Sequence, residues 1–307
     1  MKSLLVRLSS LLGTAIVIIP SAVGAAPMIG MINESSVYVK TGALTTPWIR
    51  LTNNINAASL KMYGDRVAFI DSGNNLWLKN GLGAQWYLQT ANVSKYALTT
   101  SYLAVIKADG TVWLKPGQDP RSPWVNQLIA DNAFQVYISP NQLVVLKNNG
   151  DLIGKTLNAQ GNLPMMTIAL GATKASLTDN KLVYVDTGRN VFGKDGNIFS
   201  AWWGNKKVID TRTTQLQVMG NQYCPVYHDD NFNWEQLVCS NIFGGNWSGS
   251  VFGYFTTNFD LAPTRIVVKG DNGLPSGDYL RGLESPFTGT NWVTLSTTGT
   301  EITTNKE

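Results

Sequence analysis

The stretch RVAFIDSGNNLWLKNG at residues 66–81 decides the fold, because related stretches recur along the chain at a nearly fixed interval. Each copy contains an apolar run, a turn rich in Gly, Asn or Asp, and a lysine near its end. The clearest copies read YLAVIKADGTVWLKPG (102–117), QLVVLKNNGDLIGKTL (142–157) and KLVYVDTGRNVFGKDG (181–196), and an earlier one reads MIGMINESSVYVKTG (28–42). Self-similarity at about 40 residues predicts a repeat architecture.

Two markers give the length of the repeat. The lysines that end the copies are 36 to 40 residues apart: Lys40, Lys79, Lys115, Lys155 and Lys194. Tryptophans follow at Trp48, Trp86, Trp124 and Trp203, and Met165 stands near the position where the fourth unit has no Trp. Degraded units around 223–247 and from residue 265, with Trp292, bring the predicted number to seven, with six as the alternative.

Within a unit, short apolar runs bounded by turn residues indicate four antiparallel strands. In the second unit these are 59–62, 67–70, 76–79 and 86–89. The run 143–146 is apolar at every position, so both of its faces are expected to be buried, as they are in the blades of a β-propeller. The fold class predicted is therefore an all-β propeller, most simply with seven four-stranded blades.

The two ends of the predicted propeller complement each other. Residues 301–303 correspond to the strand that precedes the apolar run in other units, while the run at 28–32 lacks such a strand, so we expect the two to share a blade. The predicted domain covers residues 26–307, with units at 28–64, 65–101, 102–141, 142–180, 181–221, 222–264 and 265–307.

Composition excludes several classes of function. The chain has 307 residues, of which 44% are hydrophobic and 14% charged, and its net charge is +4, so neither disorder nor a nucleic-acid footprint is indicated. Residues 1–25 have the basic start, apolar run and small-residue end of a signal peptide. We expect a secreted protein, extracellular or periplasmic, with no integral membrane segment after cleavage. A disulfide between Cys224 and Cys239 is then allowed.

The repeat resembles that of the tectonin and tachylectin-like propellers, and more closely a secreted bacterial repeat with the form V-L-K-x-D-G-x-x-x-V-K-x-G-x-x-x-x-x-W-V. The matching residues are VIKADGTVWLKPG (105–117) with Trp124-Val125, and VYVKTGALTTPW (37–48) with Ile49. The resemblance covers residues 28 to about 221. It implies a propeller, and sugar-binding pockets repeated around the ring. The sixth unit departs from it, with Pro225 in an expected strand and the two cysteines in a long excursion.

Aromatic side chains are the candidate ligand-binding residues, since an aromatic ring stacks on a sugar face while polar groups orient the sugar. One set shares a strand face with the repeated lysines, and the other set recurs once per unit. Packing between blades is the favoured interpretation for both sets at any single residue. The candidates are Tyr38, Lys40, Trp77, Lys79, Trp113, Lys115, Trp48, Trp86, Trp124, Trp203, Trp247 and Trp292.

No catalytic residue and no cofactor is predicted. The chain has one histidine, His228, so the usual Ser-His-Asp and Cys-His arrangements are disfavoured. With Asp229 and Asp230 it is a weak candidate metal site, and a polar hairpin tip is the preferred interpretation. Acids such as Asp71 and Asp109 occupy turn positions. Asp and Asn can replace each other there because both favour the backbone conformation of a turn.

Three functions remain as hypotheses. The first is a secreted, lectin-like protein that binds glycan through several equivalent sites. The second is a protein-interaction scaffold, such as an adhesion, inhibitor or toxin-accessory subunit, with its partner at the irregular region 222–275. The third and least favoured is an extracellular glycoside hydrolase, which would require buried, convergent carboxylates near the central channel.

Overall fold

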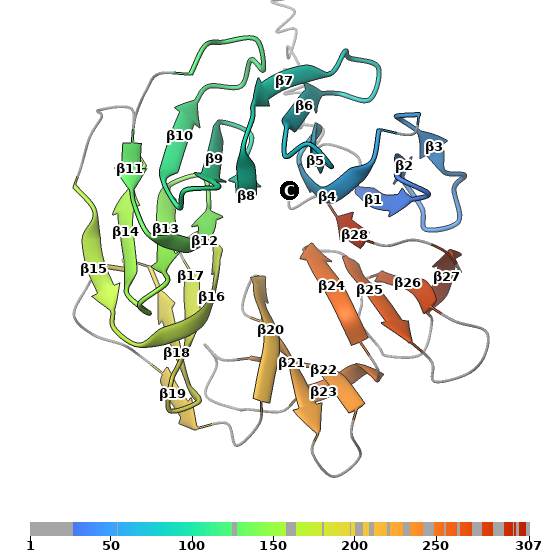
Figure 1. Cartoon of the computed structure of the whole chain (residues 1–307). Helices are drawn as coiled ribbons and strands as arrows, with labels where there is room; N and C mark the ends of the chain where they lie inside the picture. Colours follow the sequence, from blue (N-terminus) through green and yellow to red (C-terminus); the bar gives the residue numbers. More distant parts are fainter. Residues whose placement is uncertain are drawn as a thin grey trace, which may run out of the picture.

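Seven four-stranded antiparallel sheets are arranged around a central channel in the computed structural model (Figure 1). The structure describes residues 27–53, 55–124, 128–157, 164–179, 181–196, 198–199, 205–208, 212–219, 222–229, 234–241, 249–254, 256–262, 265–271, 278–284, 292–296, 298 and 301–304. The predicted seven-bladed propeller is confirmed. No helix in these ranges is long and apolar enough to cross a membrane, and the predicted signal peptide lies outside them.

The first four blades each have their inner strand at the channel and their fourth strand at the periphery. From the channel outward, blade 1 consists of β28 (Glu301–Thr304), β1 (Met28–Asn33), β2 (Ser36–Thr41) and β3 (Ile49–Arg50). Blade 2 consists of β4 (Ala57–Tyr63), β5 (Arg66–Asp71), β6 (Leu76–Asn80) and β7 (Tyr87–Thr90). Blade 3 consists of β8 (Val93–Leu98), β9 (Tyr102–Lys107), β10 (Val112–Pro116) and β11 (Leu128–Ala130). Blade 4 consists of β12 (Ala133–Ile138), β13 (Gln142–Lys147), β14 (Leu152–Thr156) and β15 (Met166–Ala169).

The remaining three blades have the same strand order. Blade 5 consists of β16 (Ala172–Thr178), β17 (Lys181–Asp186), β18 (Asn190–Asp195) and β19 (Asn205–Val208). Blade 6 consists of β20 (Arg212–Met219), β21 (Gln222–Asp229), β22 (Trp234–Asn241) and β23 (Gly249–Tyr254). Blade 7 consists of β24 (Thr256–Ala262), β25 (Arg265–Asp271), β26 (Asp278–Glu284) and β27 (Val293–Ser296).

The ring closes as the sequence predicts, because β28 pairs with β1 in blade 1. Ile29 lies opposite Thr304, and the Thr304 hydroxyl donates to the Met28 carbonyl. On the neighbouring blade, Arg265 donates to the Pro27 carbonyl. The sequence repeat is thus offset from the blade by one strand, since each unit contributes three strands to one blade and the inner strand of the next.

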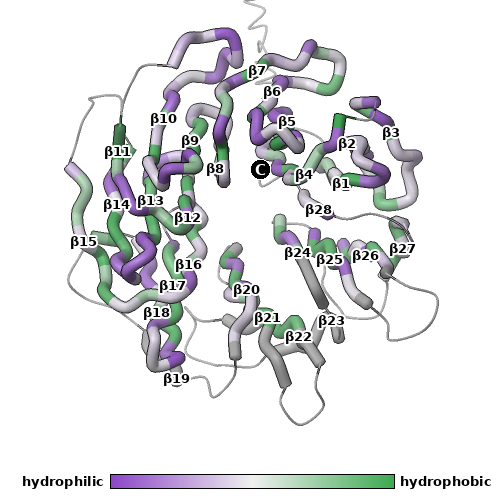
Figure 2. The backbone as a smooth tube through the Cα atoms, viewed as in Figure 1, coloured by the Kyte–Doolittle hydropathy of each residue, from purple (hydrophilic) through white to green (hydrophobic). Residues whose placement is uncertain are grey.

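The second strand of each blade contributes core residues on both of its faces. Leu143, Val144 and Val145 are fully buried, and Leu143 and Val145 contribute to one cluster between blades while Val144 contributes to the next. This explains the run without alternation: both faces of the strand are covered by a neighbouring blade. The inner strands differ, and Figure 2 shows hydrophobic and hydrophilic residues together along β16 and β20.

The strands end at residues that readily adopt the backbone conformations of turns. Asn74 and Gly110, in the hairpins of blades 2 and 3, have φ of 59° and 81°, a region that Gly and Asn tolerate best. The Asp71 carboxylate accepts from the backbone N–H of Gly73 and of Asn75, and the Asp109 carboxylate accepts from Thr111 N–H. These acids therefore stabilise their own turns, as the interchange of Asp and Asn between copies indicates.

Blade 6 corrects one detail of the sequence interpretation. Cys224 and Cys239 form the predicted disulfide, with an S–S distance of 2.05 Å. They lie on the adjacent strands β21 and β22, where a long excursion was expected. Pro225 lies within β21 and faces Leu216 in the register with β20. In the pairing of β21 with β22, Tyr223 and Val226 have partners but Pro225 has none. The strand therefore tolerates a residue that lacks a backbone N–H.

Candidate functional site

The repeated lysines are buried rather than displayed. Lys79 and Lys115 are only 3% and 2% exposed. The Lys40 ammonium donates to the Leu44 carbonyl at 2.8 Å, Lys79 donates to the Leu82 carbonyl, and Lys194 donates to the Ile198 carbonyl at 3.0 Å. Burial lowers the pKa of each of these lysines. Each lysine thus holds the loop that follows its own strand.

The once-per-unit tryptophans join neighbouring blades at the periphery of the ring. The indole N–H of Trp48 donates to the Leu295 carbonyl of blade 7 at 3.1 Å, that of Trp86 to Leu51 of blade 1 at 3.4 Å, and that of Trp124 to Gln89 of blade 2 at 2.6 Å. Each acceptor stands three residues after the corresponding tryptophan of the preceding blade. We call these contacts the peripheral joints.

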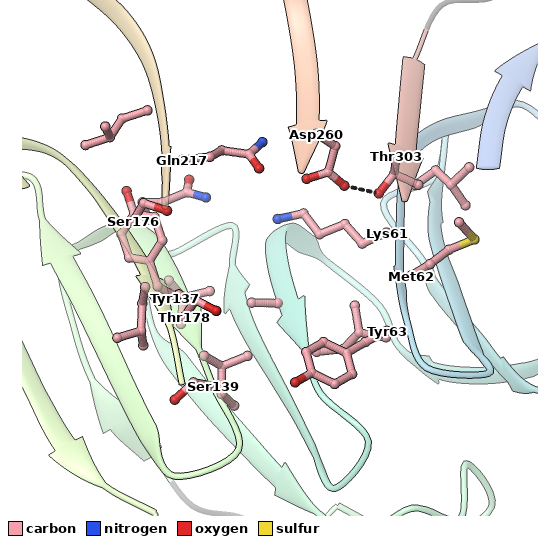
Figure 3. Close-up of a pocket in the computed structure, with 18 of the residues that line it drawn as sticks. Lys61, Met62, Tyr63, Tyr137, Ser139, Ser176, Thr178, Gln217, Asp260 and Thr303 are labelled. Atoms are coloured by element: carbon pink, nitrogen blue, oxygen red, sulfur yellow. Dashed lines mark hydrogen bonds between the residues drawn. The ribbon is translucent and has the colours of Figure 1, made fainter. Parts of the chain in front are cut away.

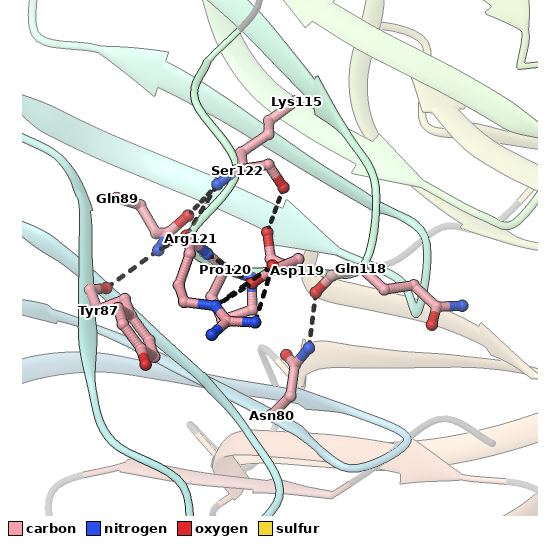
Figure 4. A network of polar contacts seen from close by, with 9 residues as sticks. All are labelled: Asn80, Tyr87, Gln89, Lys115, Gln118, Asp119, Pro120, Arg121 and Ser122. Carbon is pink, nitrogen blue, oxygen red and sulfur yellow. Dashed lines mark hydrogen bonds and ion pairs between the residues drawn. The ribbon is translucent and has the colours of Figure 1, made fainter.

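Lysine and tryptophan of one unit also meet in these joints. The ammonium of Lys40 lies 4.6 Å from the Trp48 ring centroid, that of Lys79 lies 5.1 Å from Trp86, and that of Lys115 lies 5.9 Å from Trp124. Figure 4 shows polar contacts between blades 2 and 3, where Lys115 donates to the Gln89 side chain and to the Pro120 carbonyl.

The other aromatic candidates are half-buried on the third strands. The indole N–H of Trp77 donates to Asp71 and that of Trp113 to the Thr111 hydroxyl, both at 2.9 Å, while Arg50 lies over the Tyr38 ring. Trp292 is half-buried against the core cluster between blades 6 and 7. Trp203, Trp247 and Asp230 lie outside the described residues, and His228 and Asp229 are the last residues of β21. Ligand binding at all of these residues stays a prediction.

A cavity in the central channel is the site that the sequence analysis missed. Its volume is about 300 Å³, and all seven inner strands contribute to its lining. One equivalent position on each inner strand forms a ring of side chains, which we call the belt. In order from blade 1 to blade 7, the belt is Thr303, Lys61, Ala97, Tyr137, Ser176, Gln217 and Asp260.

The inner strands present the belt because their side chains alternate. Leu60 and Met62 flank Lys61 and are almost fully buried, and Phe259 and Leu261 flank Asp260 in the same way. Successive side chains point to opposite faces of a strand, so the middle residue faces the channel. Six of the seven inner strands also carry a register shift near their start, for example between Ala57 and Ser59, which sets the same alignment in each.

Belt side chains bond the backbone of the next blade. The Tyr137 hydroxyl accepts from Ala175 N–H at 3.3 Å, and the Ser176 hydroxyl accepts from Val218 N–H at 2.9 Å. Gln217 donates to the Phe259 carbonyl at 2.8 Å and accepts from Leu261 N–H at 3.2 Å. These channel links satisfy backbone groups on the free edges of β16, β20 and β24.

Asp260 makes the last channel link and is the most strongly held belt residue. Its carboxylate accepts from the Thr303 hydroxyl at 2.7 Å, from Thr304 N–H at 3.0 Å and from Leu261 N–H at 3.0 Å. Figure 3 shows Lys61 extending into the cavity on the side of Asp260 and Gln217. Asp260 is 5% exposed, so its charge is balanced chiefly by donors within the protein.

Glu301 is the second carboxyl group at the cavity. Its pKa is raised to about 7, chiefly by burial and to a smaller extent by the charge of Asp260, while a hydrogen bond from the Leu60 backbone and the charge of Lys61 oppose the rise. Asp260 and Glu301 both line the cavity, but three donors of the protein already engage the Asp260 carboxylate. Within the described residues, however, no group of three or more His, Cys, Asp and Glu side chains could hold a metal ion.

Solved structures resemble this chain in fold. Hsv2 from Kluyveromyces lactis has 10% identity and a TM-score of 0.60, with 92% of this chain and 96% of that chain covered. A putative 6-phosphogluconolactonase from Bacteroides fragilis has 11% identity and a TM-score of 0.57, covering 91% and 96%. Prp20p from Saccharomyces cerevisiae, a protein with binding properties to Gsp1p and histones, has 8% identity and a TM-score of 0.55, covering 84% and 81%.

No protein-family model and no curated protein matches the sequence. At such low identities the solved structures show the fold alone. They therefore establish a β-propeller, and the narrower tectonin and tachylectin-like resemblance stays a prediction.

Proposed function

We propose that this chain is a non-catalytic binding protein that takes a carbohydrate ligand in its central channel. The observation that carries the proposal is the belt, because every belt residue except Ala97 has a polar side chain and all seven line one cavity of about 300 Å³. A concave site with a few converging polar groups is the usual form of a small-molecule site. Hydroxyl and amide groups suit the alternating donors and acceptors of a sugar.

The proposal moves the expected sugar site from the repeated surface to the channel. The repeated lysines are engaged in the interior, and Trp48, Trp86 and Trp124 bridge blades, whereas the belt faces a cavity. A surface lectin has several equivalent sites per chain, but a channel site has one. Stoichiometry therefore separates the two arrangements.

Secretion is part of the same proposal. The disulfide Cys224–Cys239 is supporting evidence, since such bonds persist in oxidising compartments. The first 25 residues supply the signal-like sequence.

The experiment is a glycan-array screen followed by calorimetry with the protein and two matched variants. Tyr137→Phe removes a hydroxyl from the cavity, and Trp113→Phe removes an indole from the surface. We expect one site per chain, and binding weakened by Tyr137→Phe but not by Trp113→Phe. Several sites, or sensitivity to Trp113→Phe alone, would return the site to the surface grooves.

A protein-interaction scaffold is the second candidate. It is favoured by the similarity in fold to Prp20p, which has Gsp1p and histones as protein partners. The absence of binding across a broad array would favour this candidate. The partner search would then centre on residues 222–275, where the repeat is irregular.

A further inference from the structure

The belt has two unlike halves. One half, on blades 7, 1 and 2, contains Asp260, Thr303 and Lys61, while the other half, on blades 4 to 6, contains the neutral side chains Tyr137, Ser176 and Gln217. Figure 3 shows Tyr137, Ser176 and Gln217 on strands that follow one another around the cavity. A ligand in the channel therefore meets different chemistry on its two sides.

In the neutral half, the side-chain oxygens accept hydrogen bonds from the protein, while some of the side-chain hydrogens have no acceptor among the described contacts. The hydroxyl oxygens of Tyr137 and Ser176 each accept a backbone N–H from the next blade, and the described contacts give neither hydroxyl hydrogen an acceptor. Gln217 uses its carbonyl oxygen and one amide hydrogen on blade 7, which leaves its second amide hydrogen. Burial raises the pKa of Tyr137, so the phenol keeps its proton.

The acidic side of the cavity is poorly suited to anchoring a cation. All of Asp260's described bonds are with donors inside the protein, and the raised pKa of Glu301 leaves that group partly protonated near neutral pH. Lys61 contributes the positive charge of the belt.

We propose that the channel selects a carboxylate-bearing saccharide, whose oxyanion receives donors from Tyr137, Ser176 and Gln217 and is favoured by the positive charge of Lys61. This inference rests on the proposed function and adds the charge class of the ligand. Charge-assisted hydrogen bonds to a carboxylate are about twice as strong as neutral ones. Selection between an acidic sugar and its neutral parent follows from that difference.

The test compares D-glucuronate with D-glucose, which differ at one carbon, by calorimetry or saturation-transfer NMR on the whole protein. We expect glucuronate to bind about tenfold more tightly than glucose, a ratio that one charge-assisted hydrogen bond supplies. Glucose that binds as well as glucuronate overturns the charge class and leaves the channel site standing. If neither binds and no glycan is found on the array, both proposals fail.

Two variants locate the selectivity. Lys61→Gln should reduce the preference for glucuronate to about twofold, and Ser176→Ala should weaken glucuronate binding while its effect on glucose is smaller. The matched control is Lys95→Gln on β8, because the Lys95 ammonium donates to the Phe134 carbonyl at 2.6 Å and does not line the cavity. The ratio of the two affinities is the readout, since a purely structural defect would weaken both sugars alike. An unchanged ratio in Lys61→Gln contradicts the proposal.

Discussion

Among the residues that the structure describes, the side-chain hydrogen bonds between blades lie in different places in blades 1 to 3 and in blades 4 to 7. In the first group the peripheral joints of Trp48, Trp86 and Trp124 tie each blade to the one before it. In the second group the channel links of Tyr137, Ser176, Gln217 and Asp260 tie each blade to the one after it. Among the described contacts, the boundary between blades 7 and 1 has both, and at the boundary of blades 2 and 3 the inner-strand residue Tyr96 also donates to the Ala68 carbonyl at 2.6 Å.

The difference follows the regularity of the repeat. Where the lysine and tryptophan markers recur, the periphery carries the contacts between blades. The fourth unit has Met165 near the position of the tryptophan, the last two units are degraded, and from blade 4 onward side chains of the inner strands supply contacts from the channel. A degenerate repeat can therefore stay in the ring when its neighbours bond it on the inner side.

The largest expected effect concerns the irregular group. Replacing both cysteines in Cys224→Ser/Cys239→Ser removes a crosslink between residues 15 apart, and should lower the free energy of unfolding by about 3 kcal/mol. Urea unfolding without reductant measures it. Adding reductant should destabilise the parent protein by a similar amount and leave the variant unchanged. A loss in the variant that reductant does not reproduce in the parent would contradict this account.

The next effect concerns the regular group. Trp86→Ala should cost roughly 2 to 3 kcal/mol, less than for a fully buried tryptophan, because the half-buried ring packs on Phe69 and beneath Lys79. The control Leu88→Ala removes a side chain that is 52% exposed and should change stability by less than about 0.5 kcal/mol. Equal losses in the two variants would mean that Trp86 does not act as a joint.

Removing a channel link should cost somewhat less. Asp260→Ala leaves the backbone N–H groups of Leu261 and Thr304 without the carboxylate, and should lower the free energy of unfolding by about 2 kcal/mol. Asp260→Asn retains a carbonyl oxygen and should lose about half as much. If Asp260→Ala is neutral in thermal unfolding, the channel links do not hold blades 7 and 1 together.

The smallest effect is a dependence on pH. The pKa of Glu301 is about 7 in the folded chain against 4.5 for an ordinary glutamate, so between these values the folded form holds a proton that the unfolded form releases. Stability from this group is therefore present at low pH and is lost as pH rises toward 7, by about 1 kcal/mol after allowance for solvent in the channel. Glu301→Gln should gain stability relative to the parent at pH 8 but not at pH 4.5. A difference between the two proteins that is constant with pH would exclude this role.

The fold was predictable because its evidence recurs. Lys79 and Lys115 mark equivalent positions in two copies, and the all-apolar run at Leu143–Leu146 already requires cover on both faces. Closure was predictable as well, since the strand missing from the first unit was present at Glu301–Thr303. Each of these signals is recognised when one part of the sequence is compared with another.

The candidate site was harder to predict because the belt does not repeat in residue type. A local signal did exist: Leu60-Lys61-Met62, Val136-Tyr137-Ile138 and Phe259-Asp260-Leu261 each have a polar residue between two apolar ones. Read together, these triplets place polar side chains on the channel face of the inner strands. The bonds from Ser176 and Gln217 to the next blade join residues 42 to 44 positions apart, and no local pattern predicts them.

The seam in blade 1 also has a consequence for the order of folding. The bond from Thr304 to Met28 joins residues 276 positions apart, so no fragment that lacks either end can make it. Contacts this distant cost loop-closure entropy before they return any stability, and they slow folding. The other six blades consist of strands that are consecutive in the chain and can assemble as an open arc. Closure of the seam is then the event that converts the arc into a ring and creates the channel.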